Sequence, residues 1–175
     1  MAIKTTPQDL AEQASRTYKT GDLSAAAQLF AEAAQAYMLS GDAANAAEMK
    51  NNQSVALLRN GQAQAALDAT CGTESVFAGA NDFRREGMAL GNQASALEAL
   101  KRYKDAIAAY QKSGDALAKA GEDDLRAEVM QLLSALCLRR FKFMDAVVAL
   151  QSGLTGVKNP TPKQRLMKKI LFIRL

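Results

Sequence analysis

Apolar residues recur along the chain with two nested spacings. Within single segments they fall at positions i, i+3 and i+7, as Leu23, Ala26 and Phe30 do, and this spacing places them on one face of a helix. The whole arrangement returns after forty residues, so one small position is alanine four times: Ala26, Ala66, Ala106 and Ala146. The pattern therefore predicts one helical unit repeated four times.

Turn residues divide the pattern into nine predicted helices. Thr6 is a candidate N-cap for the first helix, and Pro7 stands at the first helical position, where its missing N–H costs nothing. Gly21 ends that helix, and Asp22 can cap the next. The predicted helices are 7–19, 23–39, 42–59, 62–77, 83–100, 103–120, 122–139, 142–152 and 163–175.

The fourth predicted helix carries an interruption. Thr70, Cys71, Gly72 and Thr73 follow one another there, and they are poor helix formers. We therefore expect a kink or an early end at this point.

Four helix pairs in register predict how the chain is organised. An isolated pair cannot bury its apolar face, so pairs that repeat every 20 to 50 or so residues form a solenoid. We expect an all-α, right-handed α-solenoid of four pairs with a C-terminal capping helix. The chain is then one domain, 1–175, with repeats at about 7–41, 42–81, 82–121 and 122–156, a linker at 157–161 and a terminal helix at 162–175.

The third copy shows the residue spacing most clearly. Its two helices carry Leu90-x2-Gln93-Ala94-x2-Leu97 and Tyr103-x2-Ala106-x3-Tyr110. The first copy answers with Leu10, Ala14, Leu23, Ala26 and Phe30. These spacings resemble the tetratricopeptide repeat, and the resemblance covers residues 7–153.

The copies differ from the typical repeat in two ways. The second copy has Lys50, Ser54, Ala63 and Thr70 at the motif positions, and each period is forty residues against about 34 in the family. In this length the chain is similar to the long-helix repeats of soluble NSF attachment proteins and of cell-polarity adaptors that grip extended peptides. The resemblance implies a concave groove, lined by the first helix of each pair, that binds a peptide or helix of another protein.

Candidate binding residues lie on the helices that the resemblance assigns to the groove. Asn52 and Asn92 are equivalent in adjacent copies, at a turn where peptide-holding tetratricopeptide proteins often present Asn, and Asn51 lies beside the first. An Asn amide offers a donor and an acceptor to a peptide backbone. The alternative is a polar, solvated helix surface.

Three cations are expected along the edge of the same groove. Lys19, Arg59 and Arg139 are equivalent in copies one, two and four. They would favour an acidic ligand, because a guanidinium can hold a carboxylate with two parallel hydrogen bonds. The alternative is that isolated exposed charges only keep the surface soluble.

Positive charge gathers at the C-terminal end. Residues 1–138 hold 13 Lys and Arg against 17 Asp and Glu, whereas residues 139–175 hold nine against the single Asp145. The terminal helix is amphipathic and basic, and it admits three interpretations: a cap on the last repeat, a contact with an anionic membrane, or a contact with another subunit. Its candidate contact residues are Lys163, Arg165, Lys168 and Lys169.

Composition narrows the chemistry that the chain can carry. There is no His, no phosphate-binding glycine loop and no metal-ligand spacing, so we expect no enzyme activity, no metal and no cofactor. Cys71 and Cys137 stand far apart within helical patterns, and both are predicted to be buried, reduced thiols. Nucleic-acid binding is not expected, because aromatic residues do not interleave with the basic ones.

The ends of the chain bear on its location. The first ten residues contain no apolar signal core, and no apolar run approaches the ~20 residues of a membrane span. A cytoplasmic protein is therefore predicted. Its expected function is that of a non-catalytic adaptor for another protein; the alternative is a membrane-associated or self-assembling structural protein, so a homo-oligomer stays open.

Overall fold

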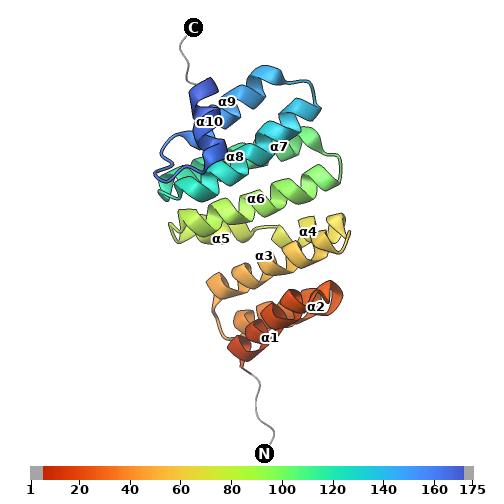
Figure 1. Ribbon diagram of the computed structural model, residues 1–175. Coiled ribbons are helices and arrows are strands. Elements are labelled where there is room, and N and C mark those ends of the chain that lie inside the picture. The colour runs from red at the N-terminus through yellow and green to blue at the C-terminus, as the bar shows by residue number, and fades with distance from the viewer. Residues whose placement is uncertain (1–5, 172–175) are drawn as a thin grey trace, which may run out of the picture.

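The computed structural model describes residues 6–171, and within this range it contains ten helices and no strand. The protein is all-α, as the sequence predicts. From α1 to α9 the helices follow one another from one end of the molecule to the other, and α10 lies beside α8 and α9 (Figure 1). They are α1 (Pro7–Thr20), α2 (Leu23–Leu39), α3 (Ala43–Arg59), α4 (Ala63–Thr70), α5 (Thr73–Gly79), α6 (Phe83–Ala99), α7 (Tyr103–Lys119), α8 (Asp123–Arg139), α9 (Phe143–Leu154) and α10 (Pro162–Leu171).

The predicted helix boundaries agree with these bounds to within a few residues. Each long helix packs against the next one along the chain, as α1 does on α2 and α6 on α7. Close packing of α6 on α7 uses Gly87, where an added Cβ would lie 2.6 Å from Cγ of Leu117. The predicted terminal helix 162–175 is observed as far as Leu171, and residues 172–175 lie outside the described part.

The turns between helices share one geometry that recurs every twenty residues. Residues 41, 61, 81, 101, 121 and 141 all have a left-handed backbone, with φ between 55° and 81°. At each of them two backbone bonds close the preceding helix; Gly41 N–H donates to the Met38 carbonyl at 3.1 Å, and Asp42 N–H donates to the Tyr37 carbonyl at 2.9 Å. This is the Schellman arrangement, and its repetition gives α3, α6, α7 and α8 the same length of 17 residues.

Side chains cap several helix starts, and Thr6 and Asp22 do so as the sequence predicts. Thr6 and Asp9 form a reciprocal capping box at α1, with Pro7 at its first turn. Asp22, Asp42 and Asp82 each accept a hydrogen bond from the backbone N–H three residues ahead.

The predicted interruption of the fourth helix is confirmed as a break between α4 and α5. Gly72 adopts φ 77° there, a conformation that a side chain would oppose. Thr73 begins the second piece, and its hydroxyl lies 2.9 Å from the Thr70 carbonyl oxygen and 3.3 Å from Asn51 Oδ1.

The two cysteines have different surroundings. Cys137 is buried in α8, as predicted. The prediction for Cys71 is wrong, because this residue lies at the end of α4 and its side chain is exposed. The equivalent position in the unbroken α7, Gln111, is exposed as well, so position 71 lies on the outward side of its repeat.

The core divides into two large clusters and a small one between them. Buried side chains of α1, α2 and α3 gather around Phe30, and those of α6 to α9 gather around Tyr110. Ala47, Phe77 and Ala89 form the small cluster between these regions. The broken helix therefore lies between the two large clusters, where the cluster of buried apolar side chains is smallest.

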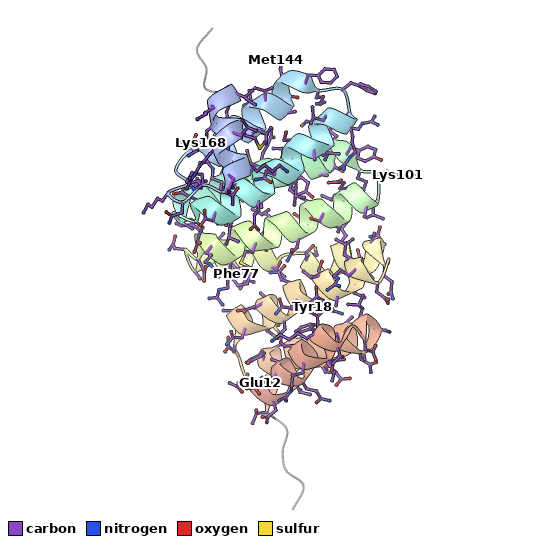
Figure 2. All side chains as sticks on the ribbon, in the orientation of Figure 1. Glu12, Tyr18, Phe77, Lys101, Met144 and Lys168 are labelled. Carbon is purple, nitrogen blue, oxygen red and sulfur yellow. The ribbon has the colours of Figure 1, made fainter. Side chains whose placement is uncertain are left out.

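The sequence predicts that the last helix caps the fourth repeat, but α10 leaves the outer face of α9 uncovered. Gly156 (φ 90°) turns the chain after α9, and α10 then packs on α9 and approaches α8, where Met167 and Leu132 line the same cleft. Leu166 and Ile170 remain 59% and 61% exposed. The outer face of α9 also stays uncovered, and Figure 2 shows Met144 at this end.

Polar contacts explain why α10 lies on the side of α9. Lys168 Nζ donates to the Val157 carbonyl at 3.3 Å, and Arg165 Nε donates to the Pro160 carbonyl at 3.0 Å. Both bonds tie the helix to the segment that precedes it. Hydrophobic periodicity alone predicts an apolar face but does not locate such bonds.

Candidate functional site

The first helices of the four predicted pairs are α1, α3, α6 and α8, and their shared surface is called the first-helix face below. Two pockets and a wider cleft lie on it. The candidate residues can be placed by the pocket that each one lines.

The first pocket, about 230 Å³ in volume, lies between α1 and α3. Lys19, Tyr18 and Asn52 are among its lining residues. Lys19 is exposed and forms no salt bridge within residues 6–171. The Arg59 guanidinium lies 4.9 Å from the centroid of the Tyr18 ring, so a second cation contacts a residue of this pocket without lining the pocket itself. Figure 2 labels Tyr18 at this place.

The second pocket, about 220 Å³ in volume, lies between α3 and α6. Asn52 and Asn92 both line it, together with Met88. Asn52 also lines the first pocket, so the two pockets adjoin through its side chain. The structure thus brings the two predicted Asn residues to one surface hollow, with half-exposed amides.

Asn51 is placed differently from its neighbour. It borders the second pocket but is only 7% exposed, and its Oδ1 is the acceptor for the Thr73 hydroxyl. A buried amide without such a partner would lower the stability of the fold. In this structure Asn51 fastens α3 to the start of α5.

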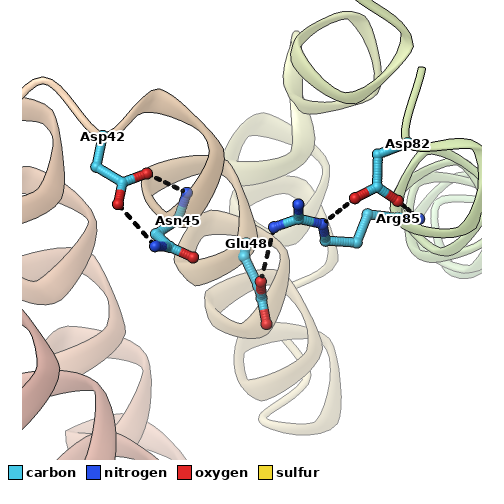
Figure 3. Close-up of polar contacts among 5 residues, drawn as sticks. All are labelled: Asp42, Asn45, Glu48, Asp82 and Arg85. Atoms are coloured by element: carbon cyan, nitrogen blue, oxygen red, sulfur yellow. Dashed lines mark hydrogen bonds and ion pairs between the residues drawn. The ribbon is translucent and has the colours of Figure 1, made fainter. Parts of the chain in front are cut away.

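A chain of polar contacts crosses the second pocket (Figure 3). Arg85 Nη1 lies 3.2 Å from Glu48 Oε2 on α3, and Arg85 Nε lies 2.6 Å from Asp82 Oδ2 at the start of α6. Asp42 caps α3 in the same way, accepting from the Asn45 backbone at 3.0 Å and from its amide at 2.7 Å. The contact between Arg85 and Glu48 joins the second and third helix pairs at the small core cluster, whereas the contact between Asp42 and Asn45 stays within the start of α3.

Hydrogen bonds to the two cap carboxylates favour their charged forms. The pKa of Asp82 is lowered, chiefly by the hydrogen bond from the Arg85 backbone, and the pKa of Asp42 is lowered, chiefly by the bond from the Asn45 backbone. Arg85 also lies 5.0 Å from the Phe77 ring centroid. Sequence analysis missed Arg85; its place three residues after a cap Asp was a usable signal, but its partner Glu48 lies 37 residues away.

Arg139 does not join the other two cations. Its guanidinium forms a salt bridge with Glu98, so α8 is tied to α6. The Tyr110 hydroxyl also donates to Glu98 at 3.1 Å and lies 3.1 Å from Ser95 Oγ. Burial raises the pKa of Tyr110 to about 12. The three predicted cations therefore have different surroundings: Lys19 lines the first pocket, Arg59 contacts the Tyr18 ring, and Arg139 is paired with a carboxylate.

The cleft at the fourth copy differs from the two pockets. It has a volume of about 620 Å³ and runs between α8 and α10, where Lys163 and Met167 line one side. Leu132 stands at the position equivalent to Asn52 and Asn92, so the row of amides ends before the fourth copy. Leu132 and Leu138 are about half exposed there, and sequence analysis did not single them out.

The four basic candidates on α10 have different surroundings. Lys163, Arg165 and Lys169 are exposed, whereas Lys168 is half-buried. Arg165 and Lys168 donate to backbone carbonyls of the preceding segment, as described above. Lys163 and Lys169 form no salt bridge with the described carboxylates.

The described residues contain neither a cluster suited to a metal ion nor a membrane-spanning helix. Within residues 6–171, no group of three or more Cys, Asp or Glu side chains is arranged to hold a metal ion. None of the helices in this range has the length and apolar character needed to cross a membrane.

No model of a protein family matches the sequence, and no curated protein matches it either.

Proposed function

We propose that the chain is a tetratricopeptide-like adaptor that binds a segment of another protein on its first-helix face and catalyses no reaction. The observation that carries this proposal is the pair Asn52 and Asn92. These amides come from equivalent positions of α3 and α6 and line one pocket. Repeated amides at a regular spacing suit a ligand that is itself regular, such as a peptide backbone.

The repeated turn geometry supports a right-handed α-solenoid. Helices of equal length joined by the same left-handed turn place each pair in a similar relation to the next. Such a stack makes an extended concave surface from its first helices. In this proposal the two pockets form the part of that surface that binds the ligand.

Charge on the face favours a ligand that is acidic at one end. Lys19 lines the first pocket and Arg59 contacts the Tyr18 ring of the same pocket, while Glu48 and Asp82 at the second pocket are paired with Arg85. An extended peptide with carboxylates over α1 and α3 and uncharged residues over α6 would match this distribution. Complementary charge of this kind contributes to specificity and to the rate of association.

A library of random displayed peptides, selected on the full chain, supplies ligands for the test. A selected peptide is titrated against the wild-type chain, against Asn52→Ala/Asn92→Ala, and against Lys104→Ala, an exposed substitution on α7 that serves as the control. We expect the double Asn variant to bind at least about tenfold more weakly, a loss of about 1.4 kcal/mol, and the control to bind normally. Equal affinity for all three chains would remove the Asn pair from the proposal.

A second candidate function is contact with an anionic membrane through α10. The exposed Leu166 and Ile170 with three exposed basic residues favour it. Flotation of the full chain and of Leu166→Glu/Ile170→Glu with vesicles of phosphatidylserine and phosphatidylcholine tests it. Wild-type flotation that the double variant loses would support this function, and no flotation of either chain would exclude it.

A further inference from the structure

A large hollow lies on a different side of α6 from the Asn pair. It has a volume of about 860 Å³ and runs between the broken helix, α4 with α5, and α7. Leu67, Leu90 and Leu97 line its floor, and small residues such as Ala78 and Ala108 stand along its walls. This hollow is called the second-helix groove below. Its residues are distinct from those of the Asn pockets, so the inference drawn from it does not depend on the proposed peptide-binding function.

The rim of the second-helix groove is negatively charged. Five carboxylates and three cations line it: Asp68, Glu74, Glu86, Asp105 and Asp115, with Arg102, Lys112 and Lys119. Two of the cations already have partners, because Arg102 forms a salt bridge with Asp105 at 2.9 Å and Lys119 lies 5.5 Å from the centroid of the Phe83 ring. The other four carboxylates form no salt bridge within the described residues. An apolar floor with an acidic rim suits a basic amphipathic helix.

α10 has the complementary chemistry. Its ten residues include Lys163, Arg165, Lys168 and Lys169 and no acidic residue. Leu166 and Ile170, one helical turn apart, share a face and are 59% and 61% exposed. Two leucine-sized side chains left in water on a basic helix favour a partner with an apolar surface and a negative rim.

We propose that α10 of one copy docks in the second-helix groove of another copy. Within a single chain α10 is tied beside α9 by Lys168 and Arg165, and its cleft with α8 is on the first-helix face. In this position α10 lies on a different side of the molecule from the second-helix groove of its own chain. We therefore expect it to dock in the groove of a neighbouring molecule. Leu166 and Ile170 then cover the floor near Leu90 and Leu97, and the basic residues of α10 approach Glu74 and Asp115.

The proposed contact is heterologous, because a helix on one copy meets a groove on the next. Each copy keeps one free helix and one free groove, so copies add head to tail until a ring closes or a chain of molecules grows. A helix of ten residues buries a small area, which places the contact among the weak interfaces. Its affinity should fall as salt is added, because opposite charges attract across the rim.

Another uncovered surface gives the competing explanation for self-association. Phe143, Met144 and Val148 are exposed on the outer face of α9. Nothing in the structure indicates what covers them. Two copies joined through this patch would form a symmetric dimer and would stop there.

Sedimentation of the full chain over a range of concentrations distinguishes these contacts. We expect the average mass of the wild-type chain to rise past that of a dimer and to fall back on addition of salt. A helix variant, Leu166→Glu/Ile170→Glu, and a groove variant, Glu74→Lys/Asp115→Lys, should each stay monomeric, whereas an equimolar mixture of them should form a one-to-one dimer. Leu39→Glu, on an exposed position of α2, is the matched control and should assemble like the wild type.

Several results would overturn the proposal. The first is that the wild-type chain remains monomeric up to about 1 mM. The second is that assembly stops at a dimer and is abolished by Met144→Ser. The third is that the helix variant and the groove variant assemble like the wild type. A helix variant that loses binding to anionic vesicles, with unchanged mass in solution, would show a membrane contact instead.

Cross-linking tests the same contact without altering the groove. Cys71 lines the second-helix groove and is exposed, whereas Cys137 is buried. A donor chain, Cys71→Ser/Leu166→Cys, is mixed with the wild-type chain and a short bis-maleimide. We expect a mixed dimer in which the cysteine introduced at position 166 of the donor is joined to Cys71 of the wild-type chain. The control donor Cys71→Ser/Leu39→Cys should give at least about tenfold less cross-linked dimer, a ratio of the size expected for one strong interface contact. Equal yields from both donors would contradict the docking of α10.

Discussion

Arg85 and Glu48 join two helix pairs across 37 residues of sequence: Arg85 Nη1 on α6 lies 3.2 Å from Glu48 Oε2 on α3. The same guanidinium binds Asp82 and lies over the Phe77 ring of the broken helix. The small core cluster of Ala47, Phe77 and Ala89 lies at this junction. Polar contacts therefore supplement apolar packing where the two large core clusters meet.

Arg85→Ala should lower the free energy of unfolding by about 1 to 2 kcal/mol. It removes a part-exposed ion pair, a cap contact and a cation–π contact together, and each is worth up to about 1 kcal/mol. Urea unfolding followed by circular dichroism measures the loss. Arg102→Ala is the control, because its salt bridge with Asp105 lies within one helix turn and is half exposed, so a loss below about 0.5 kcal/mol is expected. Equal losses in the two variants would show that the contacts of Arg85 contribute no more to stability than an exposed salt bridge does.

Lys101→Gly should raise the free energy of unfolding by about 0.5 to 1 kcal/mol. Lys101 has φ 61° in a turn whose equivalents at 41, 61 and 121 are glycine, and left-handed backbone is strained for residues with a side chain. Gln111→Gly, at an exposed position in the middle of α7, should lower it by a similar amount, because glycine weakens a helix interior. A fall in stability for both variants would contradict the role assigned to the turns.

Stability should decline in acid through the helix caps. The pKa values of Asp42 and Asp82 are lowered in the folded protein by backbone hydrogen bonds, so their contribution is present above the unfolded pKa of about 3.9 and is lost as pH falls through the folded-state values. The urea concentration at which half of the wild-type chain is unfolded should therefore decrease once the pH is lowered below about 4. Asp42→Asn/Asp82→Asn should show a shallower decline over this range, since Asn caps a helix without titrating. An equally steep decline would assign the acid sensitivity to other carboxylates.

The two thiols should react at different stages of unfolding. Cys71 is exposed at the end of α4, whereas Cys137 is buried in α8 and burial raises its pKa. A thiol reagent such as dithionitrobenzoate should label one cysteine per native chain at once and the second only in denaturant. Cys71→Ser should then show no rapid labelling, and rapid labelling in that variant would show that α8 opens in the native state.

The helices and their caps could be predicted because the signals are local. Asp22, Asp42 and Asp82 precede apolar stripes of period 3.6, and the structure places a capping bond at each of them. The break after Thr70 was also foreseeable from four poor helix formers in succession. The turns at Lys101 and Phe141 carry no glycine, so their left-handed backbone follows from the repeat rather than from the residue type.

What the sequence left open depends on contacts between distant segments. Whether Arg139 faced a ligand or a carboxylate was decided by Glu98, 41 residues away. Asn51 and Asn52 are adjacent in sequence, yet the helix turns one toward Thr73 and the other toward both pockets. The position of α10 depends on backbone carbonyls of the linker, which no pattern of side chains reveals.

The central claim, that Asn52 and Asn92 contact a bound peptide, can be measured directly by nuclear magnetic resonance. Side-chain amide signals of the ¹⁵N-labelled chain are followed while a selected peptide is added, and those of Asn60 and Asn159, which are exposed and line neither Asn pocket, serve as internal controls. The proposal predicts that the Asn52 and Asn92 amide signals shift in proportion to the fraction of peptide bound, while the two controls stay in place. Saturating peptide that leaves the Asn52 and Asn92 signals unmoved would contradict it.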